Sequence, residues 1–434
     1  MKYVRNEYIL IVLCLGLISA AACSGKDNIA EDNIEILQED SNSISESNVG
    51  DISKKEIPEV VEEKEDENKI MKEEVLQEDK TVWTFQTNGG IVASPIINGD
   101  VIYFGSKDGN LYAVNKDTGE EVWKYSIGTP ILCQPAILDE AIFFSSKEVY
   151  IAVNAMTGAE LWKYDLQPDI RATFRKDQWD YHDSTPVIDH GIVYFGSGTG
   201  AILGFDVASG ELKWEFNASG SISMRSTPMI EEGVMYYGDW AGNYRAVEIA
   251  TKNILWENSY QQAFQSAAAM KDGIIFMGGR DTRIHAIDSK TGESKWDYKD
   301  PDGSWITGDP IVDGDIVYFS TSDSEKVYAM SIEDGTVMRE YPIYKNSFSK
   351  VLIDNGLLYV TSGDAYRSPG SGKLQVYRLN DHENMAWEVS LDNGGVFTSP
   401  LLVNNIVYFG SEDGYLYAVR SNETVIECGK VFDR

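Results

Sequence analysis

The sequence predicts an all-β fold, and three observations support this prediction. The 434 residues include 38 glycines and 24 tyrosines, a turn-rich and aromatic-rich composition that is typical of β proteins. Between residues 100 and 125, short runs rich in Val, Ile, Tyr and Trp alternate with Asp-Gly and Thr-Gly turns. This stretch recurs along most of the chain, which indicates a repeat architecture. Together these observations predict an eight-bladed β-propeller of four-stranded antiparallel blades.

The first repeat illustrates how the sequence builds one blade. Its four strands are separated by turns in which Gly109 and Gly119 can adopt a positive φ and Asp side chains can bond back to the backbone. The strands are expected at residues 94–98, 101–105, 111–115 and 121–125. A meander of roughly 40 residues has the size of one propeller blade.

Eight copies of the repeat align on one residue of the first strand, with Tyr or Phe eight positions later. These residues are Pro95, Pro135, Pro186, Pro228, Ala268, Pro310, Val351 and Pro400. Their separations are 40, 51, 42, 40, 42, 41 and 49 residues, so two intervals contain insertions, at residues 167–184 and 364–372. Chance alternation does not keep one register over such a length, so the repeat count is well defined.

A tryptophan marks the fourth strand of most repeats. A single blade cannot bury both of its faces, and a flat indole on the neighbouring blade supplies the missing burial. Inter-blade packing is therefore expected for Trp83, Trp123, Trp162, Trp214, Trp256, Trp296 and Trp387.

The two ends of the repeat region predict how the ring closes. Residues 82–85 read as a fourth strand without the three strands that should precede it, and Trp83 lies 12 residues before Pro95, as Trp123 does before Pro135. The last repeat has Cys428 where Trp is expected. The N-terminal strand should therefore pair with the last repeat, which removes exposed sheet edges. Residues 425–432 are then an extra outer strand or a loose tail.

The N-terminus predicts export and a lipid anchor. Lys2 and Arg5 precede an apolar run and a small-residue box that ends at Cys23, so residues 1–22 are expected to be a lipoprotein signal peptide and Cys23 the lipidated residue. Cleavage after Ala22 without lipidation, giving a freely secreted protein, is the alternative. The apolar run is short for a membrane span.

Residues 23–80 are expected to form a disordered acidic tether, and residues 81–434 the propeller. From residue 24 to 80 there are 19 carboxylates and 7 lysines but no aromatic residue, so the segment cannot bury enough apolar area to fold. The whole chain has a formal net charge of −32. Nucleic acid is excluded as a partner on this ground, because phosphate binding needs a basic surface.

The repeated pattern YFGS-x-DG-x-LYAV-x-x-x-TG-x-x-x-W, legible from Val82 to Val419, resembles the PQQ-type repeat of eight-bladed propellers. The resemblance implies one of two functions: quinoprotein alcohol dehydrogenase, or a non-enzymatic envelope propeller such as the outer-membrane protein assembly factor BamB. The repeat is a packing device and does not choose between them.

This sequence lacks features that are expected of the quinoprotein dehydrogenases. The resemblance implies adjacent cysteines over the cofactor and calcium beside a catalytic Asp, but no two of the four cysteines are adjacent. Asp309 is the one residue that could be assigned as a base. The four histidines show no metal-ligand spacing, and we expect no catalytic residue, metal or cofactor.

The loops at one end of the channel are the predicted binding face. They include the insertion at 167–184, the blade 7 insertion, and polar or aromatic residues at the starts of inner strands, with Gln134, Asp183, Gln265, Arg280 and Trp305 nearby. Trp, Tyr and Arg are the types that dominate binding hot spots. The candidate residues are Arg171, Arg175, Lys176, Trp179, Tyr181, His182, Arg225, Trp240, Asp309, Lys350, Tyr366 and Arg367.

The structural alternatives are that Trp240 or Trp305 packs only on its own loop and that the cations of the insertion neutralise neighbouring acidic loops. The sequence thus favours a monomeric, lipid-anchored propeller that binds a protein or glycan of the cell envelope without catalysis. It would lie at the outer face of the cell membrane, or in the periplasm at the outer membrane of a Gram-negative cell. A PQQ-dependent oxidoreductase and a BamB-like assembly factor are the alternatives.

Overall fold

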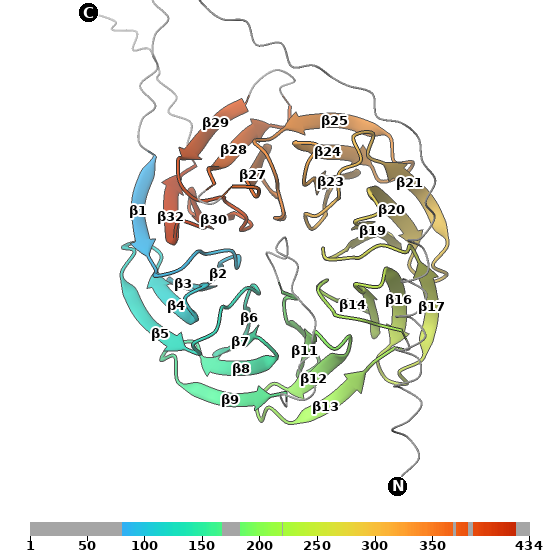
Figure 1. The fold of residues 1–434 in the computed structure, drawn as a ribbon, viewed down its shortest axis with the longest axis horizontal. Helices are drawn as coiled ribbons and strands as arrows, with labels where there is room; N and C mark the ends of the chain where they lie inside the picture. Colours follow the sequence, from blue (N-terminus) through green and yellow to red (C-terminus); the bar gives the residue numbers. More distant parts are fainter. Residues whose placement is uncertain (1–79, 167–182, 219, 368–369, 381–384, 422–434) are drawn as a thin grey trace, which may run out of the picture. The chain divides into compact units, whose positions relative to one another are not determined.

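The computed structural model describes residues 80–166, 183–218, 220–367, 370–380 and 385–421. The chain divides into two units, residues 1–75 and 76–434, and all described residues belong to the second. This unit is all-β: eight four-stranded antiparallel sheets follow one another around a ring (Figure 1). The described part of the chain contains no helix long and apolar enough to cross a membrane.

Blades 1 to 4 each use four consecutive strands, with the first strand innermost. Blade 1 comprises β2 (Ile96–Asn98), β3 (Val101–Gly105), β4 (Asn110–Asn115) and β5 (Glu121–Ser126); blade 2 comprises β6 (Ala136–Leu138), β7 (Ala141–Ser146), β8 (Val149–Asn154) and β9 (Glu160–Asp165). Blade 3 comprises β10 (Val187–Asp189), β11 (Ile192–Gly196), β12 (Ile202–Asp206) and β13 (Leu212–Phe216); blade 4 comprises β14 (Met229–Glu231), β15 (Val234–Gly238), β16 (Asn243–Glu248) and β17 (Ile254–Ser259).

Blades 5 to 7 repeat the plan, and blade 8 completes it with the N-terminal strand. Blade 5 comprises β18 (Ala269–Lys271), β19 (Ile274–Gly278), β20 (Arg283–Asp288) and β21 (Ser294–Lys299); blade 6 comprises β22 (Ile311–Asp313), β23 (Ile316–Ser320), β24 (Lys326–Ser331) and β25 (Val337–Pro342). Blade 7 comprises β26 (Leu352–Asp354), β27 (Leu357–Gly363), β28 (Gly372–Arg378) and β29 (Met385–Leu391); blade 8 comprises β30 (Leu401–Val403), β31 (Ile406–Gly410), β32 (Tyr415–Arg420) and β1 (Thr81–Gln86).

The predicted closure of the ring is confirmed. β1 pairs antiparallel with β32, so the first strand of the chain (blue) lies beside the last (red) in Figure 1. Trp83 is opposite Ala418, the relation that Trp123 has to Ala113 within blade 1. The N–H of Arg420 also donates to the carbonyl of Lys80 at 2.9 Å. Residues 425–432, with Cys428, lie outside the described residues.

Six of the seven tryptophans of the fourth strands contact the next blade in the same way. The indole Nε1–H of Trp123 donates to the carbonyl of Ala155 in blade 2 at 2.9 Å, and the ring covers Gly158 in the turn between the third and fourth strands. A Cβ on Gly158 would lie 2.6 Å from the indole, so the turn needs glycine for its space as well as for its φ of +70°. Equivalent indole-to-carbonyl bonds of 2.8–3.0 Å start from Trp83, Trp162, Trp214, Trp256 and Trp296.

Two neighbouring seams depart from this pattern. In blade 6 the tryptophan position is taken by Arg339, which pairs with Ala329 and donates from Nη1 to the carbonyl of Leu379 in blade 7 at 3.1 Å. In blade 7 the buried Nε1 of Trp387 has no hydrogen-bond partner among the described residues. The blade next to Trp387 is blade 8, whose fourth strand is β1 from the N-terminal end, so no turn connects it to the third strand. The Lys80 ammonium lies over the Trp387 ring, 4.8 Å from its centroid.

The contact between indole and glycine predicts a difference between two glycine variants. Gly158→Ala and Gly191→Ala both place a side chain at positive φ, +70° and +79°, but an added Cβ at Gly191 meets nothing within 4 Å. We expect Gly158→Ala to lose about 1–3 kcal/mol more stability than Gly191→Ala, because only the first forces Trp123 out of its place. Urea unfolding followed by tryptophan fluorescence measures both. Equal losses would mean that backbone strain alone requires glycine at Gly158.

Candidate binding face

At four of the eight blade boundaries, neighbouring blades are joined at the ring axis by the residue that directly precedes the aligned position of the first strand. The side-chain oxygen of this residue accepts a hydrogen bond from the backbone N–H of the same position in the preceding blade. This bond joins Thr185 N–H to Thr227 Oγ1 (3.0 Å), Ala267 N–H to Asp309 Oδ1 (2.6 Å), Lys350 N–H to Ser399 Oγ (3.0 Å) and Ser399 N–H to Ser94 Oγ (2.9 Å). The side chains at this position therefore fix the inner ends of the blades to one another.

In blades 4 and 8 a buried hydroxyl one residue earlier fixes the inner segment to its own blade. Ser226 Oγ donates to the carbonyl of Gly238 at 2.6 Å and accepts from its N–H at 3.2 Å. Thr398 makes the same two bonds with Gly410, twelve residues further on, at 3.0 and 2.9 Å. The inner segments of these two blades are therefore held both by their own blade and by a neighbouring one.

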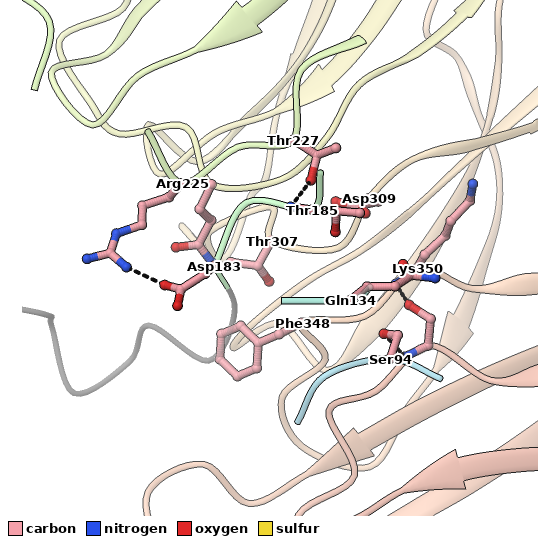
Figure 2. Close-up of a pocket in the computed structure, with 12 residues that line it drawn as sticks. Ser94, Gln134, Asp183, Thr185, Arg225, Thr227, Thr307, Asp309, Phe348 and Lys350 are labelled. Atoms are coloured by element: carbon pink, nitrogen blue, oxygen red, sulfur yellow. Dashed lines mark hydrogen bonds and ion pairs between the residues drawn. The ribbon is translucent and has the colours of Figure 1, made fainter. Parts of the chain in front are cut away.

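These segments enclose a small pocket on the ring axis, here called the axial pocket (Figure 2). Its volume is about 50 Å³, and all eight blades contribute to its wall. The lining residues are Ser94, Gln134, Asp183, Thr185, Arg225, Thr227, Gln265, Thr307, Asp309, Phe348, Lys350 and Ser399.

The axial pocket carries balanced charge in an otherwise acidic protein. Arg225 donates from Nη1 to Asp183 Oδ1 at 2.6 Å, and the two side chains are only 13% and 23% exposed. Asp309 is half-buried, whereas Lys350 is exposed at the pocket edge. Two cations therefore face two carboxylates across a wall made otherwise of hydroxyls, carboxamides and one phenyl ring.

The turns between second and third strands and the loops between blades lie on the same face, here called the loop face. The N–H of Trp240, in the β15–β16 turn, donates to the carbonyl of Ser223 in the preceding loop at 3.1 Å. Arg280, in the β19–β20 turn, donates likewise to Ala263 at 3.1 Å. Both kinds of loop therefore lie side by side.

A stack of two indoles and a guanidinium crosses blades 4 to 6 on the loop face. Arg280 lies 4.3 Å from the ring centroid of Trp240 on one side and 4.3 Å from that of Trp305 on the other. Its Nε donates to Gln265 Oε1 at 2.9 Å, which connects the stack to the wall of the axial pocket. Trp240 therefore packs across a blade boundary and not only on its own loop, and cation–π contacts of this kind favour a fixed arrangement.

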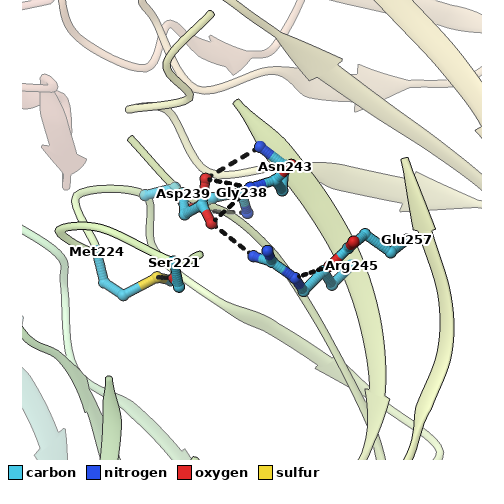
Figure 3. A network of polar contacts seen from close by, with 8 residues as sticks. Ser221, Met224, Gly238, Asp239, Asn243, Arg245 and Glu257 are labelled. Atoms are coloured by element: carbon cyan, nitrogen blue, oxygen red, sulfur yellow. Dashed lines mark hydrogen bonds and ion pairs between the residues drawn. The ribbon is translucent and has the colours of Figure 1, made fainter. Parts of the chain in front are cut away.

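A buried ion pair supports the turn that carries Trp240 (Figure 3). Arg245 Nη1 donates to Asp239 Oδ2 at 2.6 Å, and both side chains are at most 1% exposed. Asp239 Oδ1 also accepts from the N–H of Asn243 at 3.0 Å, and Arg245 Nε bonds to Glu257. Removing one member of such a pair leaves an uncompensated buried charge, so Asp239 anchors the turn strongly.

The sequence-predicted residues fall into three groups. Arg225, Asp309 and Lys350 meet in the axial pocket, while Trp240 lies in the stack beside it. Tyr366 and Arg367 lie on the blade 7 insertion outside this pocket: the Tyr366 hydroxyl bonds to Asp323, and Arg367 pairs with Asp364 at 3.4 Å. Arg171, Arg175, Lys176, Trp179, Tyr181 and His182 lie outside the described residues.

Several wall residues were not predicted from the sequence. Their common signal is their place in the repeat, one or three residues before the aligned position of the first strand, which brings side chains to the axis in every blade. They are Ser94, Thr185, Thr227, Thr307, Phe348 and Ser399.

Burial raises the pKa of the Cys133 thiol to about 11, so this cysteine is a protonated core residue at neutral pH. Among the described residues, no group of three or more His, Cys, Asp or Glu side chains could hold a metal ion.

Fold and repeat together define an eight-bladed propeller of the PQQ-repeat class. The chain matches the profile of the PQQ-like family described as outer membrane protein assembly factor BamB over residues 73–298 and 217–424, and it belongs to that family. It is 22% identical to the outer membrane protein assembly factor BamB of Yersinia pestis, over 79% of this chain and 78% of that protein.

Enzymes are also among the similar proteins. The chain is 21% identical to the tetrathionate hydrolase of Acidithiobacillus ferrooxidans, over 77% of this chain and 73% of that protein. The crystal structure of the quinohemoprotein alcohol dehydrogenase of Comamonas testosteroni superposes with a TM-score of 0.61 at 12% identity, over 79% of this chain and 76% of that one. At this identity the structural likeness concerns the fold alone.

The residues present do not fit the quinone cofactor that the dehydrogenase branch of the fold implies. Pockets that hold organic ligands measure roughly 300–1,000 Å³, and the axial pocket measures about 50 Å³. Its wall is also committed to holding the blades together through the bonds of Thr227, Asp309 and Ser399. The axial pocket is therefore too small for such a cofactor.

The axial bonds predict a stability difference between two variants of one threonine. Thr227→Val keeps the shape but removes the acceptor for Thr185 N–H, whereas Thr227→Ser keeps the hydroxyl. We expect Thr227→Val to cost about 1 kcal/mol and Thr227→Ser less, as measured by denaturant unfolding. If both variants lose the same amount, the threonine methyl and not the hydrogen bond holds blades 3 and 4 together.

Proposed function

We propose that the protein is exported, anchored by a lipid on Cys23, and binds a partner protein of the cell envelope through the loop face without catalysing a reaction. The stack of Trp240, Arg280 and Trp305 carries this proposal, because aromatic and Arg side chains in fixed positions are the usual centres of protein interfaces. Its support by the buried Asp239–Arg245 pair lowers the ordering cost of binding.

The acidic segment before the propeller would allow the propeller to bind partners at a distance from the membrane. A flexible chain of the 57 residues 24–80 spans roughly 40–45 Å on average. A propeller on such a tether could meet partners well away from the membrane surface. We infer that the domain order, with signal peptide 1–22, tether 23–80 and propeller 81–434, serves this purpose.

Membership of the BamB-described family favours one particular task in an organism with an outer membrane. The family profile spans the whole ring, from residue 73 to 424. In such an organism, we propose that the partner belongs to the machinery that assembles outer-membrane proteins. In an organism without an outer membrane, the same face would serve another envelope protein or a glycan.

Crosslinking in cell-envelope extract, with and without changes on the loop face, tests the proposal. We expect the double variant Trp240→Ala, Trp305→Ala to reduce partner recovery at least tenfold, since the stack would be lost. Val122→Ser is the matched control, because Val122 is 49% exposed on the outer strand β5, away from this face. The triple variant Arg171→Ala, Arg175→Ala, Trp179→Ala tests in the same way whether the insertion at residues 167–184 contributes to partner binding.

Partner recovery that is unchanged in both loop-face variants but lost in Val122→Ser would move the interface to the outer rim. A melting temperature measured for each variant separates loss of binding from loss of fold.

Cofactor addition tests the enzymatic alternative. With pyrroloquinoline quinone and Ca²⁺ added to purified protein, we expect neither a shift in cofactor absorbance nor dye-linked oxidation of alcohols or sugars, since the axial pocket is too small. Stoichiometric binding together with turnover would establish the dehydrogenase function instead.

A further inference from the structure

The wall of the axial pocket retains hydrogen-bonding capacity that the fold does not use. Asp309 Oδ1 accepts from Ala267 N–H at 2.6 Å, but Oδ2 accepts no hydrogen bond from any described residue. Asp309 lines the pocket (Figure 2) and thus keeps one charged oxygen without a partner among the described residues. An anionic oxygen in this position can bind an ammonium group.

The remaining wall groups are mainly donors. The hydroxyls of Thr227, Ser94 and Ser399 each accept a backbone N–H, which leaves their O–H groups to donate. Gln265 accepts from Arg280 through Oε1, so its NH₂ group is available, and the Lys350 ammonium forms no ion pair with described residues. Converging donors and an ammonium bind a carboxylate.

The size of the pocket limits what can bind. One water needs about 10–15 Å³ of such volume, so about 50 Å³ holds only a few non-hydrogen atoms. Glycine, the smallest α-amino acid, has that size. It also carries both required charges, on two groups bonded to one carbon atom, and Asp309 and the donors all line this pocket.

We propose that the axial pocket binds a free small α-amino acid, with its ammonium on Asp309 and its carboxylate on the donors of Gln265, Thr227 and Lys350. The balanced charge of the wall supports this choice over a simple anion or cation, because Arg225 and Lys350 offset Asp183 and Asp309. This site goes beyond the proposed docking function and does not depend on it.

Calorimetric titration of the full chain with glycine tests the proposal. We expect saturable binding of one glycine per chain, and at least tenfold weaker binding of glycolate, which lacks the ammonium, and of glycinamide, which lacks the carboxylate. Asp309→Asn should weaken glycine binding at least tenfold while its amide oxygen still accepts Ala267 N–H. Asp315→Asn, at a 94% exposed carboxylate, is the matched charge control and should bind as the wild type does.

A second variant keeps the test independent of any folding defect in Asp309→Asn. Lys350→Met removes the ammonium but leaves the backbone bond to Ser399, and it should also weaken glycine binding. No saturable heat would mean that the pocket holds water only, which overturns the proposal. Binding of glycolate equal to that of glycine, or glycine binding unchanged in Asp309→Asn, would overturn it as well.

Discussion

The antiparallel pairing of β1 with β32 is the contact on which the ring depends. All other strand pairs join consecutive strands, whereas this pair brings Trp83 beside Ala418. Bringing β1 and β32 together closes a loop of more than three hundred residues, which costs conformational entropy. The pairing compensates with a ladder from Thr81 to Gln86, interrupted once between Thr81 and Trp83, removes two sheet edges and covers Gly119 of blade 1 with an indole. Without β1, blade 8 would have three strands and blade 1 would lose its aromatic cover.

Most of the fold could be predicted because each repeat carries its strand and turn pattern in a short local sequence. In blade 1 the predicted strands agree with the observed ones except at their ends: the first strand begins at Ile96 rather than at residue 94. Arg339 could not be recognised as a substitute for tryptophan, because a polar residue on an outer strand reads as solvent-exposed. Its role depends on the carbonyl of Leu379, which only the assembled ring brings near.

The site was less predictable for a related reason. Alternation along a strand tells which residues face a neighbouring blade, but the axis gathers one or two residues from each of eight distant segments. Arg225, Asp309 and Lys350 were recognised by their charge, whereas Thr227 and Ser399 looked like ordinary residues before a proline. Their use follows from the bond each makes to the preceding blade.

The two irregular blade boundaries affect how the ring is expected to unfold. Both border blade 7: on one side Arg339 replaces an indole, and on the other the Nε1 of Trp387 is buried without a partner among described residues. Repeat proteins lose their units one interface at a time when one interface is weaker than the rest. We therefore expect local unfolding of the ring to begin at blade 7, while the other blades keep their packing.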